Sequence, residues 1–321
     1  MIRTVIGLDG GGTKTVGVLV DGQGHVLARA VADSSNFQVV GGETLGRVIS
    51  DLVNHLLKQA GQAHPLGHLY AGLAGAGRPA DRQTILAVLE SKKLAEKITI
   101  DTDASAALAG AFAGGPGIIV ISGTGAICFG KDSQGALYRC GGWGYLLGDE
   151  GSGYYIGQQA LIAALKDWDG RGPKTGLRPA IEEKYGIGSI DLLISSIYGG
   201  RIDRTEIAGL APLVFDQREE GDVAAQNIIT SAGEEIGKII AAVAQRMALA
   251  GRSVRVALIG SVFKQRDILI PLMEKEACRV VREIHFMDPQ FEPAIGSAIL
   301  ALQQEQILVD DTVLAHLAEA K

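Results

Sequence analysis

The chain has 321 residues with a formal net charge of −6, and 47% of its residues are hydrophobic while 21% are charged. These values are ordinary for a globular protein and argue against disordered, collagen-like and coiled-coil classes. The acidic balance, without any block of Lys or Arg, argues against a nucleic-acid partner. A length above 300 residues favours two domains that each bury a core.

No targeting or membrane segment is expected. The apolar start of the chain runs directly into an acidic, Gly-rich turn and lacks the pattern of a secretion signal. The stretch between Asp103 and Lys131 carries no charge, but residues 114–117 (GGPG) interrupt it. It is predicted to form a small-residue helix, a turn and a buried strand at 118–122 instead of a membrane span. We therefore expect a cytoplasmic protein without a membrane partner.

The chain has three cysteines, Cys128, Cys140 and Cys278, and none of them is in a CxxC pair. We expect buried thiols in a reducing compartment, because an odd number without pairing does not suit a disulfide scaffold. The six histidines show no spacing that suits a zinc site.

The first thirty residues predict a three-stranded meander, read as VIGLD, GGGTKT, VGVLV, DGQG and HVLARA. A later segment, GIIVI, SGTGA, ICFG, KDSQG and ALYRC, has the same layout. Thr13 and Thr124 are 111 positions apart (124 − 13), and the same offset places Asp21 on Asp132, Gln23 on Gln134 and Gly24 on Gly135. This match indicates an internal duplication.

Helices and strands alternate after each meander. Helices are predicted at 44–60, 81–91, 154–166, 222–250 and 294–304, and strands at 66–73, 98–100 and 254–259. The alternation predicts an α/β protein with mainly parallel pairing beside each meander. We expect two duplicated lobes, 1–116 and 117–321, with the last helix packing back on the first lobe and a ligand cleft between the lobes.

Each meander contains a turn suited to phosphate. Gly11 and Gly12 follow a buried strand, so that backbone N–H groups can face a phosphate, while Thr13 and Lys14 add a hydroxyl and a positive charge. Asp9 is expected to hold Mg²⁺ through water. The pattern matches neither a Rossmann nor a Walker A sequence. A Gly-rich hairpin alone is often a simple turn.

The second turn, Ser122-Gly-Thr-Gly-Ala126, strengthens the phosphate interpretation. It supplies Gly123 and Thr124, and two such turns facing a cleft can hold the β and γ phosphates between them. Val120 stands where the first copy has Asp9, so only the first turn offers a carboxylate to a metal.

Asp103 is the candidate catalytic base. Phosphoryl transfer to a hydroxyl needs a carboxylate within hydrogen-bond reach of that hydroxyl. Asp103 stands in IDTDA, at a strand end that opens into a helix. A helix N-cap is the alternative interpretation, and the two roles are compatible.

The ordered set DGGGTKT, TDA, ISGTGA, GGWG, GDEGS and IGSV, from about Ile6 to Leu302, resembles the N-acetylglucosamine kinase and BadF/BadG/BcrA/BcrD ATPase branch of the sugar kinase/Hsp70/actin superfamily. The resemblance implies two duplicated actin-like, ribonuclease H-like lobes that use ATP and Mg²⁺. It assigns Gly260 and Ser261 to the adenosine and Asp103 to the sugar and to catalysis. A simple strand-to-helix turn is the competing interpretation of Gly260 and Ser261.

The resemblance also implies a set of sugar contacts: Asn36, Gly142, Trp143, Gly144 and Asp149. The alternatives are a turn residue for Asn36 and a core anchor for Trp143. Glu150 could instead cap the helix that begins near Ser152.

The expected function is ATP-dependent phosphorylation of an amino-sugar hydroxyl, with N-acetylglucosamine giving N-acetylglucosamine 6-phosphate. The alternatives are a glucosamine kinase and a kinase for both N-acetylmuramate and N-acetylglucosamine. A BadF-type activator ATPase would require cysteines that hold an iron–sulfur cluster. A sugar-responsive binding protein without turnover is a further alternative, and a homodimer is implied by resemblance only.

Overall fold

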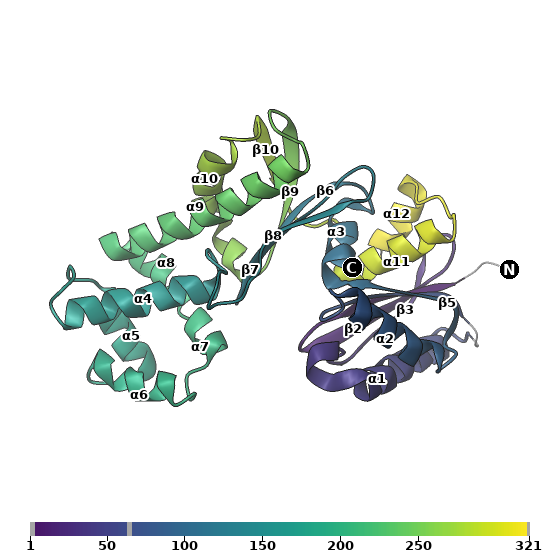
Figure 1. The fold of residues 1–321 in the computed structure, drawn as a ribbon, viewed down its shortest axis with the longest axis horizontal. Coiled ribbons are helices and arrows are strands. Elements are labelled where there is room, and N and C mark those ends of the chain that lie inside the picture. The colour runs from purple at the N-terminus through teal and green to yellow at the C-terminus, as the bar shows by residue number, and fades with distance from the viewer. Residues whose placement is uncertain (1–3, 63–65, 320–321) are drawn as a thin grey trace. The chain divides into compact units, whose positions relative to one another are not determined.

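The computed structural model describes residues 4–62 and 66–319 and divides into two compact units (Figure 1). One unit contains the described residues of Met1–Pro116 and Pro289–Lys321, and the other is Gly117–Asp288. The sequence predicted a second lobe that extends to residue 321. The second unit instead ends at Asp288, and the rest of the chain belongs to the first unit. No helix in these described residues is long and apolar enough to cross a membrane.

The first unit is built on a five-stranded sheet with the order β3-β2-β1-β4-β5. Its strands are β1 (Val5–Gly10), β2 (Lys14–Val20), β3 (Val26–Asp33), β4 (Leu66–Leu73) and β5 (Ala95–Thr102). The first three form the predicted antiparallel meander, and β4 and β5 continue the sheet in parallel.

Helices cover both faces of this sheet (Figure 1). They are α1 (Phe37–Gln59), α2 (Pro79–Glu90), α3 (Asp103–Phe112), α11 (Pro293–Gln304) and α12 (Asp311–Ala318). Side chains alternate along β1: Ile6 and Leu8 join the core beneath α1, while Val5 joins the core beneath α11. Because Gly7 has no side chain, α11 packs directly against the backbone of β1. A Cβ at Gly7 would lie 2.3 Å from the Ala294 carbonyl oxygen.

The second unit repeats this sheet. Its strands are β6 (Gly117–Ser122), β7 (Ala126–Lys131), β8 (Leu137–Gly141), β9 (Ser253–Ile259) and β10 (Glu283–Met287), in the order β10-β9-β6-β7-β8. Read from the third strand of each meander, both sheets have the same order and the same strand directions. The predicted duplication is therefore present in the topology.

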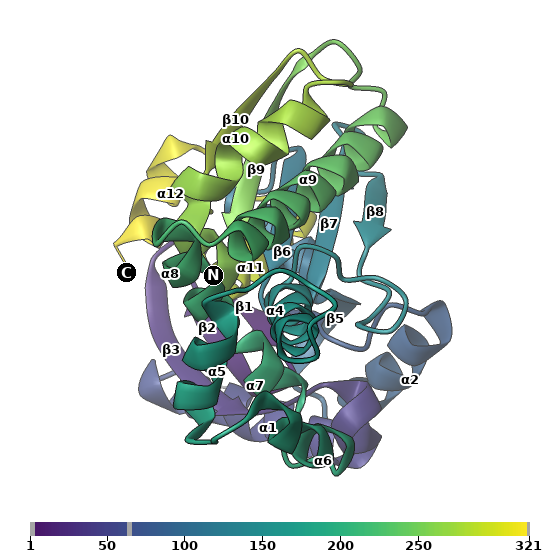
Figure 2. The same cartoon turned by 90° about the vertical axis from the view of Figure 1, so that its left-hand side faces the viewer.

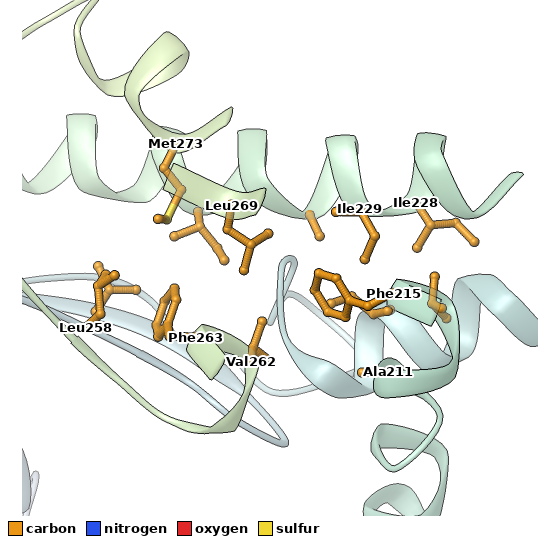
Figure 3. Close-up of a cluster of buried hydrophobic side chains, with 14 of the residues drawn as sticks. Ala211, Phe215, Ile228, Ile229, Leu258, Val262, Phe263, Leu269 and Met273 are labelled. Carbon is orange, nitrogen blue, oxygen red and sulfur yellow. The ribbon is translucent and has the colours of Figure 1, made fainter. Parts of the chain in front are cut away.

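The helices of the second unit are α4 (Gly153–Trp168), α5 (Leu177–Tyr185), α6 (Leu193–Tyr198), α7 (Arg204–Ala208), α8 (Ala211–Glu219), α9 (Val223–Arg246) and α10 (Arg266–Ala277), with 3₁₀ turns η1 (Ile190–Leu192) and η2 (Ser261–Gln265). The long helix α9 crosses the sheet and contacts β6, β7 and β8 (Figure 2). In the core, Phe215 of α8 and Ile229 of α9 point toward one another (Figure 3). This packing anchors α8 to the rest of the unit.

Most predicted elements are confirmed, including the strand at 66–73 and the helix, turn and strand that replace a membrane span. The first helix begins earlier than predicted, at Phe37, because Gly41 with φ 71° joins two helical pieces across a kink. The sequence missed β10 and the helices α5 to α8, α10 and α12. The expectation of buried cysteines holds for Cys128 but is wrong for Cys278, which is an exposed thiol after α10.

Candidate active site

The Gly-rich turn between β1 and β2 is held by its own backbone and by the loop after β3. The Gly11 N–H donates to the Lys14 carbonyl at 2.9 Å, and the Ser34 hydroxyl donates to the Gly11 carbonyl at 3.0 Å. Gly12 lies in open space, since a Cβ there would meet only Asn36 Nδ2 at 3.9 Å. The turn is fixed on one side and accessible on the other.

The carboxyl ends of the parallel strands bring acidic residues to one edge of the first sheet. Asp9 on β1 is in register with Gly72 on β4, which is in register with Asp101 on β5. Asp103 follows two residues later as the first residue of α3. Ligands of open α/β sheets bind at this edge.

The environment of Asp9 favours a bound cation. Desolvation by burial, followed by repulsion from Asp103 and Glu292, raises the pKa of Asp9 to about 6, although Lys14 opposes the shift. The sequence missed Glu292, which reaches this edge from the start of α11 and forms a two-pronged ion pair with Arg29 at 3.0 Å. Negative charge concentrated in this way is relieved by a cation.

Asp103 does not cap α3. The N-cap is Thr102, whose hydroxyl oxygen accepts from the Ser105 N–H at 3.2 Å, so the cap interpretation of Asp103 is wrong. Asp103 Oδ1 accepts from the Ala104 N–H at 2.9 Å. The side chain is open to solvent, yet the protein packed around it raises its pKa through desolvation, partly offset by the backbone hydrogen bonds.

Asn36 is the N-cap of α1, with its Oδ1 accepting from the Gln38 N–H at 3.1 Å. The backbone of Gly75 packs against it, since a Cβ at Gly75 would lie 2.7 Å from Asn36 Oδ1. Asn36 therefore lies between the first Gly-rich turn and the loop after β4 that contains Gly75.

The second Gly-rich turn is held from both sides. The Ser122 hydroxyl donates to the Gly151 carbonyl at 2.9 Å, and the Gly153 N–H donates to the Gly123 carbonyl at 2.7 Å. On the other side is Gly260, where a Cβ would lie 2.1 Å from the Ser122 carbonyl oxygen. Its φ of +115° is a conformation that favours glycine.

A cavity of about 350 Å³ joins this turn to the turn after β9. It is lined by Gly123, Thr124, Gly153, Thr205, Ala208, Gly209, Ala211, Pro212, Phe215, Ser261, Val262, Lys264 and Gln265. The structure thus brings the second predicted phosphate turn and Ser261 of the predicted adenosine turn to one cavity. Its apolar wall comes from α7 and α8, which carry no motif and were not predicted. Polar turns beside an apolar wall suit a nucleotide, whose base is flat and largely apolar.

The GGWG segment follows β8 and is tied to the second turn by Asp149. This buried carboxylate accepts from the Gly144 N–H at 3.2 Å, and a Cβ at Gly125 would lie 2.8 Å from its Oδ2. Asp149 has a φ of 61°, and Gly142 and Gly144 also have positive φ values. The segment is therefore a tight, built loop.

Trp143 is 65% exposed, so the core-anchor interpretation is wrong. The Arg139 guanidinium lies 4.6 Å from the centroid of its ring and supports one face. The helix after this segment is capped by Ser152, whose hydroxyl accepts from the Tyr155 N–H, and not by Glu150.

The predicted residues divide between the units. The first unit holds Asp9, Gly11, Gly12, Thr13, Lys14, Asn36 and Asp103, and the second holds Gly123, Thr124, Gly142, Trp143, Gly144, Asp149, Gly260 and Ser261. In residues 4–62 and 66–319, no three His, Cys, Asp or Glu side chains form a metal cage. The carboxylate of Asp9 fits Mg²⁺ that keeps most of its water ligands.

Three similarities to known proteins cover nearly the whole chain. An N-acetylmuramic acid/N-acetylglucosamine kinase of Clostridium acetobutylicum is 34% identical over 94% of this chain and 98% of its own. An N-acetyl-D-glucosamine kinase of Dictyostelium discoideum is 31% identical over 94% of this chain and 98% of its own. A Chromobacterium violaceum protein, provisionally named an N-acetylglucosamine kinase, is 30% identical with a TM-score of 0.72, covering 94% of this chain and 99% of that one.

These similarities agree with the repeated sheets and confirm the expected two-lobed, actin-like ATPase fold. A profile of the BadF/BadG/BcrA/BcrD ATPase family matches residues 6–301. This chain belongs to the BadF/BadG/BcrA/BcrD ATPase family.

Proposed function

We propose that the chain is an ATP-dependent kinase that transfers a phosphoryl group to a hydroxyl of an amino sugar, with N-acetylglucosamine as the favoured acceptor and its 6-phosphate as the product. The observation that carries the proposal is the pair Asp9 and Asp103 at the carboxyl edge of the first sheet, where Asp103 contributes to the raised pKa of Asp9. One carboxylate is placed for a metal and the other for a hydroxyl. The activities named for these relatives support an amino sugar as the acceptor.

Asp103 is the proposed general base. Its raised pKa moves it toward neutral pH, where a carboxylate accepts a hydroxyl proton more effectively, and its exposed side chain is reachable by a sugar. The hydrogen bond from the Ala104 N–H fixes its orientation. The hydroxyl oxygen then attacks the γ-phosphorus as its proton passes to Asp103, and ADP leaves.

The proposed nucleotide contacts lie in both units. Gly123 and Thr124 line the 350 Å³ cavity, where the Thr124 hydroxyl can donate to phosphate, and Ser261, next to Gly260, lines the space proposed for adenosine. Gly11, Gly12, Thr13 and Lys14 form the other phosphate turn. Mg²⁺ near Asp9 would neutralise charge on the phosphate oxygens.

The sugar contacts are proposed for Asn36, Asp103, Gly142, Trp143, Gly144 and Asp149. The exposed ring of Trp143 offers an apolar surface for an acetyl methyl group, which favours an N-acetylated sugar. This observation favours N-acetylglucosamine over glucosamine.

The activator ATPase and the non-catalytic binding protein are less favoured. A cluster shared between subunits needs several accessible thiolates. Cys278 is the only exposed cysteine of the three, none of them stands in a CxxC pair, and burial raises the pKa of the Cys128 thiol well above its ordinary value. A cytoplasmic location and a homodimer remain predictions from the sequence.

The test is ADP formation from Mg-ATP with N-acetylglucosamine, glucosamine, N-acetylmuramic acid, N-acetylmannosamine or glucose. We expect the highest kcat/KM with N-acetylglucosamine and slow ADP formation without sugar. A preference for glucosamine would contradict the assigned acceptor while keeping the reaction. Equal rates with and without every sugar would overturn the kinase proposal.

A further inference from the structure

Two of the three cysteines face one another across neighbouring strands. Cys128 on β7 is in direct register with Cys140 on β8. Directly opposed residues of an antiparallel pair have their side chains on the same face of the sheet, so the two thiols are neighbours. Cys128 belongs to the core of the second unit, and Cys140 packs against that core. The pair lies 12 positions apart (140 − 128), so no CxxC pattern marks it.

The spacing of this pair suits a disulfide after a small movement. The Gly142 N–H donates to the Ala126 carbonyl at 2.9 Å, and hydrogen-bonded pairs recur at every second position, so Cys128 and Cys140 form such a pair as well. Their Cα atoms are then about 5.5 Å apart, within the range of about 4.4–6.8 Å for disulfides. Opposed Cβ atoms are about 4.5–5.5 Å apart, whereas a disulfide holds them at about 3.8 Å. Formation of the bond therefore draws β8 toward β7.

A movement of β8 is transmitted to the candidate active site. β8 is the last strand in the order β10-β9-β6-β7-β8, so it lies at the edge of the sheet. β7 begins at Ala126, the last residue of the second Gly-rich turn, and β8 ends at Gly141, where the GGWG segment begins. Arg139, the neighbour of Cys140 on β8, supports the ring of Trp143. A shift of β8 therefore changes the position of Trp143.

The two thiols differ in their access to an oxidant. Cys128 is fully buried, and this burial, followed by the nearby Cys140, raises the pKa of its thiol well above the ordinary value. Thiolates react with oxidants faster than thiols do, so Cys128 reacts slowly on its own. Cys140 is only partly buried and can be reached by a small oxidant. Cys140 is therefore the thiol that reacts first, and Cys128 is the resolving thiol.

We propose that Cys128 and Cys140 form a reversible disulfide that displaces the GGWG segment when the protein meets a peroxide. The Cys140 thiolate attacks one oxygen of hydrogen peroxide, the O–O bond breaks, hydroxide leaves, and Cys140 becomes a sulfenic acid. The Cys128 sulfur then attacks the Cys140 sulfur, the S–O bond breaks, and the hydroxyl group leaves with the Cys128 proton as water. Two thiols are oxidised to a disulfide while one peroxide is reduced to two waters. The effect on activity rests on the proposed function, whereas the disulfide does not.

The disulfide is tested in the purified full-length Cys278→Ser variant, which lacks the exposed thiol that could link two molecules. The reduced protein is treated with hydrogen peroxide, alkylated under denaturing conditions and mapped by mass spectrometry. We expect linked peptides that contain Cys128 and Cys140, and dithiothreitol should separate them again. Cys140→Ser in the same background is the control that lacks the pair, and thermal unfolding verifies that it folds.

Two further measurements test the effect on the site. Trp168→Phe, at the end of α4, leaves Trp143 as the one tryptophan, so its fluorescence reports on the GGWG segment without a need for activity. We expect oxidation to shift this emission reversibly. Oxidation should also raise the KM for N-acetylglucosamine by roughly fivefold and change the KM for ATP by less than about twofold. Cys140→Ser should show none of these changes.

Thiols that stay unlinked after peroxide treatment would overturn the inference. A mapped disulfide that changes neither the Trp143 emission nor the KM for the sugar would also overturn it, as would the same changes in Cys140→Ser. A mapped disulfide with the expected change in emission, in a protein that phosphorylates none of the sugars, would instead overturn the proposed function and leave the disulfide and its movement standing.

Discussion

Asp9 and Asp103 lie at the carboxyl edge of the same sheet, and the negative charge of Asp103 is one cause of the raised pKa of Asp9. Burial is the larger cause, and Glu292 adds to it. Ionised Asp9 is therefore less stable in the folded protein than in water, because it is desolvated and repelled by its acidic neighbours. Such an arrangement costs stability and is useful if a cation and a phosphate-bearing ligand bind there.

Asp103→Asn should abolish the base without harming the fold. Thr102 caps α3, and the asparagine Oδ1 can still accept from the Ala104 N–H, so the unfolding temperature should stay near that of the wild type. Turnover should fall by about 100-fold or more, since general-base catalysis contributes roughly that much. Steady-state ADP formation and thermal unfolding measure the two effects. Asp311→Asn, in the first turn of α12, is the matched control. Near-normal turnover in Asp103→Asn would remove Asp103 from catalysis.

Asp9→Asn should stabilise the protein in the absence of Mg²⁺ and nucleotide. The folded pKa of Asp9 is about 6 against an ordinary 3.8, so ionisation is harder in the folded state. The carboxylate therefore costs nothing at low pH, where it is protonated in both states. Its cost grows as the pH rises through about 4 to 6 and is complete above that range. At pH 7.5 the variant should gain roughly 1–3 kcal/mol in the free energy of unfolding.

Urea unfolding at several pH values checks this sign. The gain should disappear near pH 4, and kinase activity should be lost at every pH. Mg-ATP should raise the unfolding temperature of the wild type more than that of the variant. Destabilisation at pH 7.5 would show that Asp9 is structurally favourable and would contradict its assignment as a strained cation site.

Gly260→Ala should damage the second unit far more than a comparable change elsewhere. A Cβ at Gly260 would lie 2.1 Å from the Ser122 carbonyl oxygen, and the φ of +115° adds strain. Gly135→Ala is the matched control, because Gly135 also has a positive φ but has no atom within 4 Å of the added Cβ. We expect the control to lose about 1–2 kcal/mol of stability and Gly260→Ala to lose more than about 4 kcal/mol or to fail to fold. Equal losses would show that the close approach of the two turns is unimportant.

Ala208→Leu should fill part of the 350 Å³ cavity without disturbing the first unit. Ala208 lines this cavity on α7 and is partly exposed, so the larger side chain occupies the space proposed for adenosine. The KM for ATP should rise by roughly tenfold, about 1.4 kcal/mol of lost binding, with an unchanged unfolding temperature. Titration with ADP in a calorimeter measures this directly. Normal ADP affinity would place the nucleotide elsewhere.

The duplication could be predicted because its markers act locally. Asp21 Oδ1 accepts from the N–H groups of Gln23 and His25, and Asp132 Oδ1 accepts from those of Gln134 and Ala136, all at 2.9 to 3.0 Å. Both turns end on a glycine with positive φ, Gly24 and Gly135. Turn chemistry of this kind depends on a few neighbouring residues and is readable in sequence.

Other parts of the site depend on contacts between distant segments. Glu292 raises the pKa of Asp9 only because the chain returns to the first unit at α11, and no local pattern signals that proximity. The cavity wall on α7 and α8 is made by short helices of five and nine residues, which carry little periodicity. The sequence could not show which residue caps α3, because Thr102 and Asp103 are both good capping residues. The structure shows that Thr102 is the N-cap, because its backbone is extended and the helix begins at Asp103.

The proposed kinase activity is tested most directly by following the phosphoryl group itself. The protein is incubated with Mg-ATP labelled in the γ-phosphoryl group and with N-acetylglucosamine, and the products are separated and identified by mass spectrometry and NMR. We predict that the label appears in N-acetylglucosamine 6-phosphate, and that Asp103→Asn suppresses its transfer. Label found only in inorganic phosphate, at a rate independent of the sugar, would contradict the account and identify the protein as an ATPase that is not a sugar kinase.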